Sequence, residues 1–227
     1  MEFTKEQIGK MMDHAVLKPS MTDGDIRKNA AMCIAKKVGD LCVRPSDAAL
    51  AASLVKGTGT TVAVVVGFPH GASRPEVKAL EAKLAIEDGA NELDMVMNIG
   101  KFLSGDYDWV VRDIKAVVAV AKPKGIVVKV IQESCLLTLE QVAKACELSI
   151  QAGADFVKTS TGFNGDGATV EQVEVMLKTC RGRAKVKPSG GIRDWDRAVM
   201  FAKMGVDRLG VGAAAQILDG SLTTSNY

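Results

Sequence analysis

Eight short runs of β-branched and apolar residues alternate with longer segments of helical patterning, and this alternation constrains the fold more than any other feature. Strands that alternate with helices pair in parallel through right-handed crossovers. The chain is therefore predicted to be an α/β protein. The predicted strands are Asp13–Leu17, Leu41–Arg44, Thr61–Val66, Glu92–Met97, Val127–Ile131, Phe156–Thr159, Lys185–Lys187 and Arg208–Val211.

The helical segments open with residues that favour helix N-termini. Threonine is followed three residues later by glutamine in Thr138–Gln141 and in Thr169–Gln172, which is the pattern of a capping box. Ser73–Glu76 adds a proline in the first turn, where a missing N–H costs nothing. Asp194 is expected to cap a helix that runs to Met204.

Closure of eight parallel strands into a (β/α)8 TIM barrel would remove the sheet edges, and 227 residues fit a compact barrel. A doubly wound open sheet is the alternative. It needs a phosphate-binding turn such as GxGxxG after the first strand, whereas Asp13–Leu17 is followed by Lys18–Ser20. Length alone allows one or two domains, but no linker or change of composition divides the chain. We predict one barrel domain over residues 1–227, with a short polar tail from about residue 219.

Net charge and aromatic content argue against several classes of partner. The chain has 29 Lys and Arg against 27 Asp and Glu, and the net charge of +2 is too small to attract nucleic acid or anionic lipid. Aromatic residues make up 4%, too few for base stacking. No stretch approaches the roughly 18 apolar residues of a membrane span. We therefore expect no nucleic-acid partner and no membrane partner.

Cysteines and histidines are few and scattered. The five cysteines form no CxxC pair, which predicts reduced thiols rather than disulfides or a thiolate zinc site. The two histidines, His14 and His70, are too few for a catalytic zinc site, so we expect no metal. The N-terminal sequence MEFTKEQIGK lacks the apolar block of a signal peptide, which with the reduced thiols favours a cytoplasmic protein.

Three lysines lie inside otherwise apolar strands: Lys129, Lys158 and Lys187. They are 29 residues apart in both intervals, so we expect them at equivalent levels of three adjacent strands, pointing into the barrel near its C-terminal mouth. One such lysine is usually a surface residue whose amine reaches water. Three buried together need a chemical use or carboxylate partners.

A lysine amine attacks a carbonyl only when it is unprotonated. A neighbouring cation and a dry site lower its pKa from about 10.4 toward neutrality, which favours Schiff-base catalysis. Asp94 is the carboxylate best placed to move a proton, with Asp13 and Glu133 nearby, although each could simply pair with a lysine. Glu92 and Asp40 are interpreted as solvated charges. Spacing does not identify which lysine is the nucleophile.

Glycine-rich turns follow the last two strands, where barrels often bind phosphate through backbone N–H groups. These turns are Ser189–Ile192 and Gly210–Ala213, and Thr159–Gly162 after strand six offers hydroxyl and N–H donors. The candidate substrate-binding residues are Thr159, Gly162, Gly190, Gly191, Gly212 and Ala213.

Five segments, in order along nearly the whole chain, resemble the deoxyribose-phosphate aldolases. The resemblance implies a class I aldolase on a (β/α)8 barrel, without metal or other cofactor. Its substrates would be a small sugar phosphate, 2-deoxy-D-ribose 5-phosphate, and the aldehydes acetaldehyde and D-glyceraldehyde 3-phosphate. Family analogy also suggests a homodimer. The segments are Asp13–Pro19, Gly67–Gly71, Glu92–Gly100, Gly153–Gly162 and Lys187–Arg193.

The resemblance also implies roles for individual residues. Lys158 matches the Schiff-base lysine, Lys187 the second lysine that lowers the pKa of the first, and Asp94 the proton-relay carboxylate. Lys129 matches a further polar position of the substrate site. Tyr227 matches a C-terminal tyrosine that in some members enters the site and assists proton abstraction; the other interpretation is a disordered terminus.

The chain departs from the family pattern at two places. Gly210–Ala213 stands where many members have Gly-Thr-Ser-Ser, so two hydroxyls are missing, each worth about 1.5–3 kcal/mol toward phosphate. Ala15 replaces a threonine. Two alternatives follow: a lysine-dependent aldolase with a different or unphosphorylated acceptor, and a non-catalytic phosphosugar-binding barrel. Cys42 is interpreted as a core residue or as a thiol that adds to unsaturated aldehydes.

Overall fold

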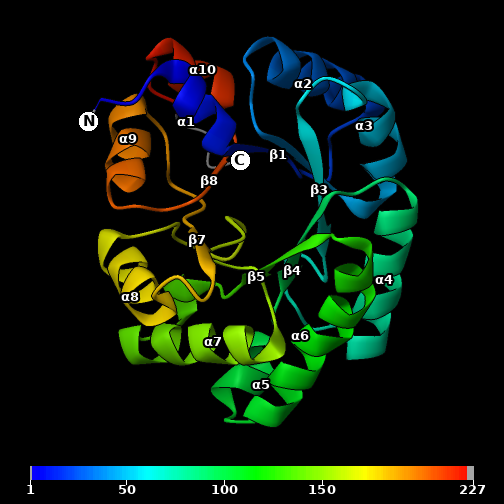
Figure 1. The fold of residues 1–227 in the computed structure, drawn as a ribbon, viewed down its shortest axis with the longest axis vertical. Helices are drawn as coiled ribbons and strands as arrows, with labels where there is room; N and C mark the ends of the chain where they lie inside the picture. Colours follow the sequence, from blue (N-terminus) through cyan, green and yellow to red (C-terminus); the bar gives the residue numbers. More distant parts are fainter. Residues whose placement is uncertain (1, 224–227) are drawn as a thin grey trace.

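The computed structural model describes residues 2–223, and its central feature is a ring of eight parallel strands surrounded by helices (Figure 1). The strand order is β7-β6-β5-β4-β3-β2-β1-β8, and a bridge between Ser189 and Gly210 brings the two ends together. The barrel prediction is confirmed and the doubly wound alternative is wrong. The strands are β1 (Met12–Val16), β2 (Asp40–Val43), β3 (Thr61–Val66), β4 (Glu92–Val96), β5 (Val127–Ile131), β6 (Phe156–Lys158), β7 (Lys185–Lys187) and β8 (Leu209–Val211).

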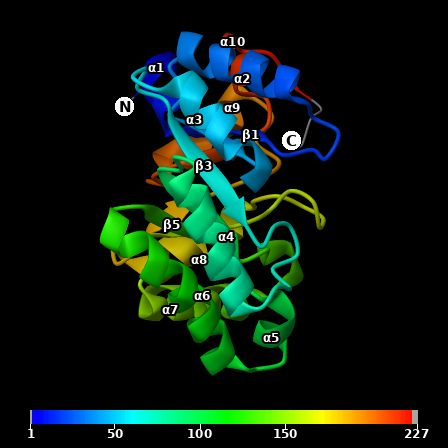
Figure 2. The same ribbon diagram turned by 90° about the vertical axis from the view of Figure 1, so that its right-hand side faces the viewer.

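Helices follow the strands and cover the outside of the barrel, as the side view in Figure 2 shows. They are α1 (Lys5–Met11), α2 (Asp23–Ala35), α3 (Ala48–Val55), α4 (Pro75–Glu87), α5 (Ile99–Leu103), α6 (Tyr107–Ala121), α7 (Leu139–Ala152), α8 (Val170–Cys180), α9 (Trp195–Lys203) and α10 (Ala214–Asp219). Three short 3-10 helices, Pro45–Asp47, Lys122–Lys124 and Ser134–Leu136, lie between them.

The helix starts are set by local side-chain caps. The predicted capping boxes at Thr138 and Thr169 are present, and Asp194 caps α9 as expected. At α4 the proline opens the helix, but the N-cap is Arg74 and no side chain caps the backbone. Proline already removes one unpaired N–H there, so the helix begins without a side-chain acceptor.

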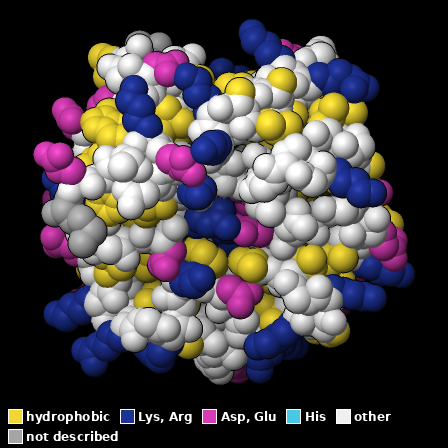
Figure 3. Space-filling view, turned by 45° about the horizontal axis from the view of Figure 1, so that its top comes forward, with side chains coloured by type: hydrophobic (Ala, Val, Ile, Leu, Met, Phe, Trp, Pro, Cys, Tyr) yellow, Lys and Arg dark blue, Asp and Glu magenta, His cyan; other side chains and the backbone are white. Residues whose placement is uncertain are grey.

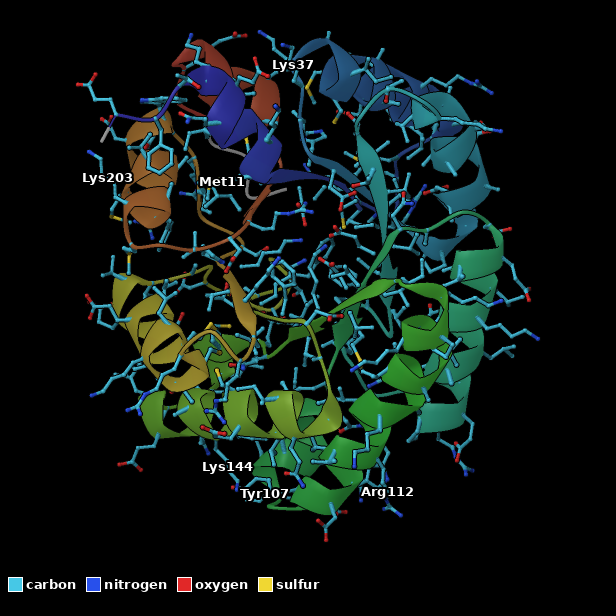
Figure 4. All side chains as sticks on the ribbon, in the orientation of Figure 1. Met11, Lys37, Tyr107, Arg112, Lys144 and Lys203 are labelled. Atoms are coloured by element: carbon cyan, nitrogen blue, oxygen red, sulfur yellow. The ribbon has the colours of Figure 1, made fainter. Side chains whose placement is uncertain are left out.

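The main apolar core lies between the outer face of the strands and the helices. Valines and leucines of alternate strand positions point outward into this layer, as Val62, Val64 and Leu41 do, and helix residues such as Val117 and Phe201 meet them. The barrel interior is therefore left to the other strand face. Figure 4 shows side chains filling this interior, while Lys37, Lys144 and Lys203 lie on the outer rim.

Strand register places the three lysines at two levels rather than one. Lys158 pairs in register with Lys187, but its partner on β5 is Ile131. Lys129 instead pairs with Asp94 and Phe156, two residues closer to the N-terminal end of the barrel. The prediction of three equivalent levels is wrong for Lys129. Equal spacing along the chain counts loop and helix residues, whereas the stagger between strands sets the level.

The surface does not present a broad field of one sign on the face shown in Figure 3, where a central group of basic side chains is bordered by acidic ones. Among the described residues, no helix is long and apolar enough to cross a membrane.

Candidate active site

The centre of the site is the buried carboxylate of Asp94 on β4, which contacts all three lysines. Its Oδ2 lies 2.7 Å from Nζ of Lys158 and 2.7 Å from Nζ of Lys187, and its Oδ1 lies 2.8 Å from Nζ of Lys129. None of the four side chains is more than 2% exposed. The structure thus brings together Asp94, Lys158 and Lys187, as the sequence predicted.

The lysines differ in how many carboxylates hold them. Within residues 2–223, Asp94 is the one carboxylate that forms an ion pair with Lys158, whereas Lys187 pairs with Asp94 and also with Asp13. Lys129 lies within 4.0 Å of four carboxylates. A lysine with fewer anionic partners gives up its proton at lower energy, so Lys158 is the best candidate for a neutral amine.

The charges of this cluster shift its pKa values. Burial would raise the pKa of Asp94, but Lys129, Lys158 and Lys187 outweigh it and hold the pKa well below its usual value. Burial would lower the pKa of Lys158, but Asp94 outweighs burial and raises it. The net shift of the Lys158 pKa is therefore upward rather than downward as predicted, because the Asp94 carboxylate lies between Lys158 and Lys187 and outweighs the lowering by burial and by Lys129.

A second group of charges fills the barrel interior below Asp94. Arg208 donates to Asp13 at 2.7 Å and to Glu92 at 2.6 Å, and the Lys129 amine lies between Asp13, Glu92 and Asp40. Barrel interiors usually hold branched apolar residues at this depth. The interpretation of Asp40 and Glu92 as solvated charges is wrong, since they are 0% and 6% exposed.

Asp13, Asp40 and Glu92 are also the described residues whose oxygen atoms lie close enough together to hold a metal ion. The Lys129 ammonium already occupies the space between them. Burial and the neighbouring Asp13 raise the pKa of Asp40 well above its usual value. Sequence reasoning missed Asp40 and Arg208, although strand alternation puts both on the inward face.

An apolar wall lies at the same end of the barrel as Lys158. It contains Leu17, Cys42 and Val65, with Phe68 packed against it. Burial raises the pKa of the Cys42 thiol to about 12, so this cysteine is protonated at neutral pH and its interpretation as a core residue is favoured.

The glycine-rich loops meet at the C-terminal end of the barrel. A Cβ on Gly190 would lie 3.0 Å from Cα of Gly167 and 3.8 Å from Cα of Gly162, so the loops after β6 and β7 pack backbone against backbone. Gly190 and Gly191 both have positive φ, at +77° and +72°, which glycine adopts without strain. Gly212 and Ala213 follow β8 directly.

The predicted role of Thr159 differs from its place in the structure. Its hydroxyl accepts from the backbone N–H of Ser189 at 2.9 Å and donates to the Ser189 carbonyl at 3.1 Å, so it joins two loops. The next residue, Ser160, is fully buried, and its hydroxyl has no hydrogen-bond partner among the described residues. Ser160 shares the strand face of Lys158 and is a candidate that sequence reasoning did not single out.

His14 and Tyr227 complete the list of candidates. His14 lies in β1, within the predicted strand, and its Nε2 is 2.7 Å from the Asn29 side-chain oxygen on α2. His70 lies in the loop between β3 and α4. Tyr227 lies outside the described residues 2–223, so its predicted role stays a prediction.

Comparison with known proteins identifies the family of this chain. The family model described as "DeoC/LacD family aldolase" matches residues 8–215. A deoxyribose-phosphate aldolase of Geobacillus sp. is 47% identical over 98% of this chain and 100% of its own length. One from Thermococcus gammatolerans is 48% identical, covering 94% and 96%.

A solved structure from Aeropyrum pernix, described as a tetrameric deoxyribose phosphate aldolase, superposes with a TM-score of 0.89 at 32% identity. The match covers 95% of this chain and 91% of that one. The resemblance found in the sequence is confirmed: the chain belongs to the DeoC/LacD family of aldolases, and its relatives within that family are deoxyribose-phosphate aldolases.

Proposed function

We propose that this protein is a class I aldolase that reversibly cleaves 2-deoxy-D-ribose 5-phosphate to acetaldehyde and D-glyceraldehyde 3-phosphate. The observation that carries the proposal is the buried Asp94 carboxylate between the amines of Lys158 and Lys187. A buried lysine beside a carboxylate that can take its proton is the arrangement that imine chemistry needs.

In the cleavage direction, the neutral amine of Lys158 attacks the C1 aldehyde of the open-chain sugar, and loss of water leaves a protonated imine. A base removes the C3 hydroxyl proton, the C2–C3 bond breaks, and its electron pair forms the enamine of acetaldehyde. C3 becomes the aldehyde carbon of glyceraldehyde 3-phosphate. Protonation of the enamine and hydrolysis then release acetaldehyde and restore Lys158.

Asp94 is proposed as the proton relay, because one of its oxygens contacts both Lys158 and Lys187. Lys187 would keep a positive charge beside the reacting atoms and favour the neutral form of Lys158 once Asp94 is protonated. Lys129, held by four carboxylates, would orient Asp94 rather than react. We propose that no metal or other cofactor takes part, since the protonated imine is itself the electron sink.

The phosphate is proposed to lie against backbone N–H groups of the loops that follow β6, β7 and β8. Because these hydrogen-bond donors belong to the backbone, glycine residues can supply them. The candidate residues for this end of the substrate are Gly162, Gly190, Gly191, Gly212 and Ala213.

Borohydride trapping tests the proposal. Incubation with acetaldehyde and borohydride is expected to add an ethyl group to Lys158, found by peptide mass mapping and absent from Lys158→Ala. An adduct on Lys187 or Lys129 would keep the imine mechanism but overturn the assignment. No adduct on the folded protein would contradict the aldolase and favour the phosphosugar-binding barrel.

An aldolase that prefers an unphosphorylated acceptor is the second candidate. Gly210–Ala213 has no hydroxyl group, and Phe163, 39% exposed, packs edge-on against Phe68 at a ring distance of 5.2 Å. Comparable kcat/KM values for deoxyribose and deoxyribose 5-phosphate would favour this candidate.

Assembly and location stay predictions. The Aeropyrum pernix protein is described as a tetramer, and we propose at least a homodimer for this chain. The described cysteines are all free, which supports a reducing compartment such as the cytoplasm. We also propose that the single barrel domain extends over residues 1–227.

A further inference from the structure

Glu133 is a buried carboxylate that the proposed reaction does not use. It follows β5 by two residues, is 1% exposed, and has a left-handed backbone with φ of 53°. No Lys or Arg in the described part of the chain forms an ion pair with it. A buried carboxylate in an uncommon backbone conformation needs other compensation.

Three hydrogen bonds from one loop supply that compensation. Oε1 accepts from the backbone N–H of Thr161 at 2.9 Å. Oε2 accepts from the Thr161 hydroxyl and, at 2.8 Å, from the side-chain amide of Asn164. Both oxygens of the carboxylate therefore act as hydrogen-bond acceptors, for two N–H groups and one O–H group.

The contacts of Thr161 and Asn164 extend the connection to neighbouring loops. The Asn164 amide also donates to the carbonyl of Pro69, in the loop after β3, at 3.2 Å. The Thr161 hydroxyl accepts from the backbone N–H of Phe163 at 3.1 Å. Glu133 therefore joins the ends of β3, β5 and β6 on the face where substrate is proposed to bind.

We infer that Glu133 is a positioning residue: through Thr161 and Asn164 it holds the loop after β6 in the conformation that presents Gly162 to the phosphorylated half of the substrate. This inference rests on the proposed function. Among the described residues, no hydrogen bond or ion pair joins Glu133 to Lys158 or Asp94, so Glu133 acts on binding of that half of the substrate and not on imine formation.

The test uses Glu133→Gln in the full-length protein. An amide keeps the size of the side chain but has one acceptor oxygen, so it cannot accept all three hydrogen bonds. We expect KM for deoxyribose 5-phosphate to rise about tenfold, as expected from the loss of one charge-assisted hydrogen bond, with kcat changed less than about threefold. The rate of acetaldehyde trapping at Lys158 is expected to stay at the wild-type value.

Glu147→Gln is the matched control, because this substitution removes the same charge from a residue on the outer surface, where Glu147 pairs with Arg183. Its KM is expected to equal that of the wild type. An unchanged KM in Glu133→Gln would overturn the inference. Slower trapping with unchanged KM would also overturn it, by placing Glu133 at the reacting atoms.

If Glu133→Gln does not fold, Thr161→Val and Asn164→Ala test the same inference. Each removes a side-chain donor to Glu133 while leaving the carboxylate, and each is expected to raise KM without slowing trapping. Two folded variants with wild-type KM would contradict the positioning role. Absence of trapping in the wild type would instead contradict the proposed function and leave the Glu133 contacts unaffected.

Discussion

At the residue scale, the proposed reactivity of Lys158 depends on the Asp94 carboxylate. Burial and the charge of Lys129 lower the pKa of Lys158, and Asp94 raises it above the usual value. Since only the neutral amine reacts, the trapping rate is expected to rise with pH until the pH passes this raised pKa. Asp94 therefore stabilises the Lys158 ammonium in the resting cluster. Because it lies so close, Asp94 can also receive the proton that Lys158 loses.

Asp94→Asn removes the main cause of the upward shift and leaves the causes that lower the pKa. We expect the midpoint of the pH profile of acetaldehyde trapping to move to lower pH, while kcat for cleavage falls because the relay is lost. The midpoint, not the maximum rate, is the quantity to measure, with Asp88→Asn on the surface as the control. A midpoint that stays or moves upward would show that Asp94 does not set the pKa of Lys158.

At the element scale, an ion pair inside the protein joins two helices. Lys78 of α4 donates to Asp113 of α6 at 2.6 Å and to the Val96 carbonyl at 2.8 Å, and both charged side chains are fully buried. The two helices lie side by side in Figures 1 and 2. The pair fixes α4 and α6 relative to the end of β4, the strand that carries Asp94.

Lys78→Met should leave the Asp113 carboxylate buried and without a cation. We expect the free energy of unfolding to fall by about 3–5 kcal/mol in urea denaturation, the usual cost of an uncompensated buried charge. Lys83→Met is the control, because Lys83 is 61% exposed and its pair with Glu87 should be worth at most about 0.5 kcal/mol. Equal stabilities of the two variants would contradict a structural role for the buried pair.

At the scale of the whole molecule, α4 presents a row of apolar side chains to solvent. Val77, Leu80 and Leu84 recur at helical spacing and are 53%, 56% and 51% exposed. The same patch on two copies can meet across a two-fold axis, which is the commonest assembly of identical chains. We therefore expect the interface of the predicted homodimer to lie on this face of α4.

Light scattering measures the assembly directly. The wild type is expected at about twice the chain mass of 24.0 kDa or more, and Leu80→Glu is expected to reduce the mass toward that of one chain. Leu139→Glu on α7, where the leucine is 46% exposed, is the matched control. A wild-type monomer would refute the homodimer, and an undiminished mass in Leu80→Glu would place the interface elsewhere.

The sequence by itself determined the fold class, the strand positions and the starts of the helices at Thr138, Thr169 and Asp194. These depend on local properties, such as the β-branched run at Val127–Ile131 and the capping box at Thr138, which act within a few residues. It also indicated Lys158, Lys187 and Asp94 as one site, because parallel strands align their ends.

Only the tertiary structure decided how deep each charged side chain lies in the barrel, which residues it contacts and how its charge is balanced. The stagger between strands placed Lys129 below Lys158, and packing inside the barrel buried Asp40 beside Lys129 and set Asp94 between two amines so that the pKa of Lys158 rises. Each of these results depends on contacts between residues far apart in the chain. Spacing along the sequence does not contain that information, because a change of strand register alters the contacts and leaves the spacing the same.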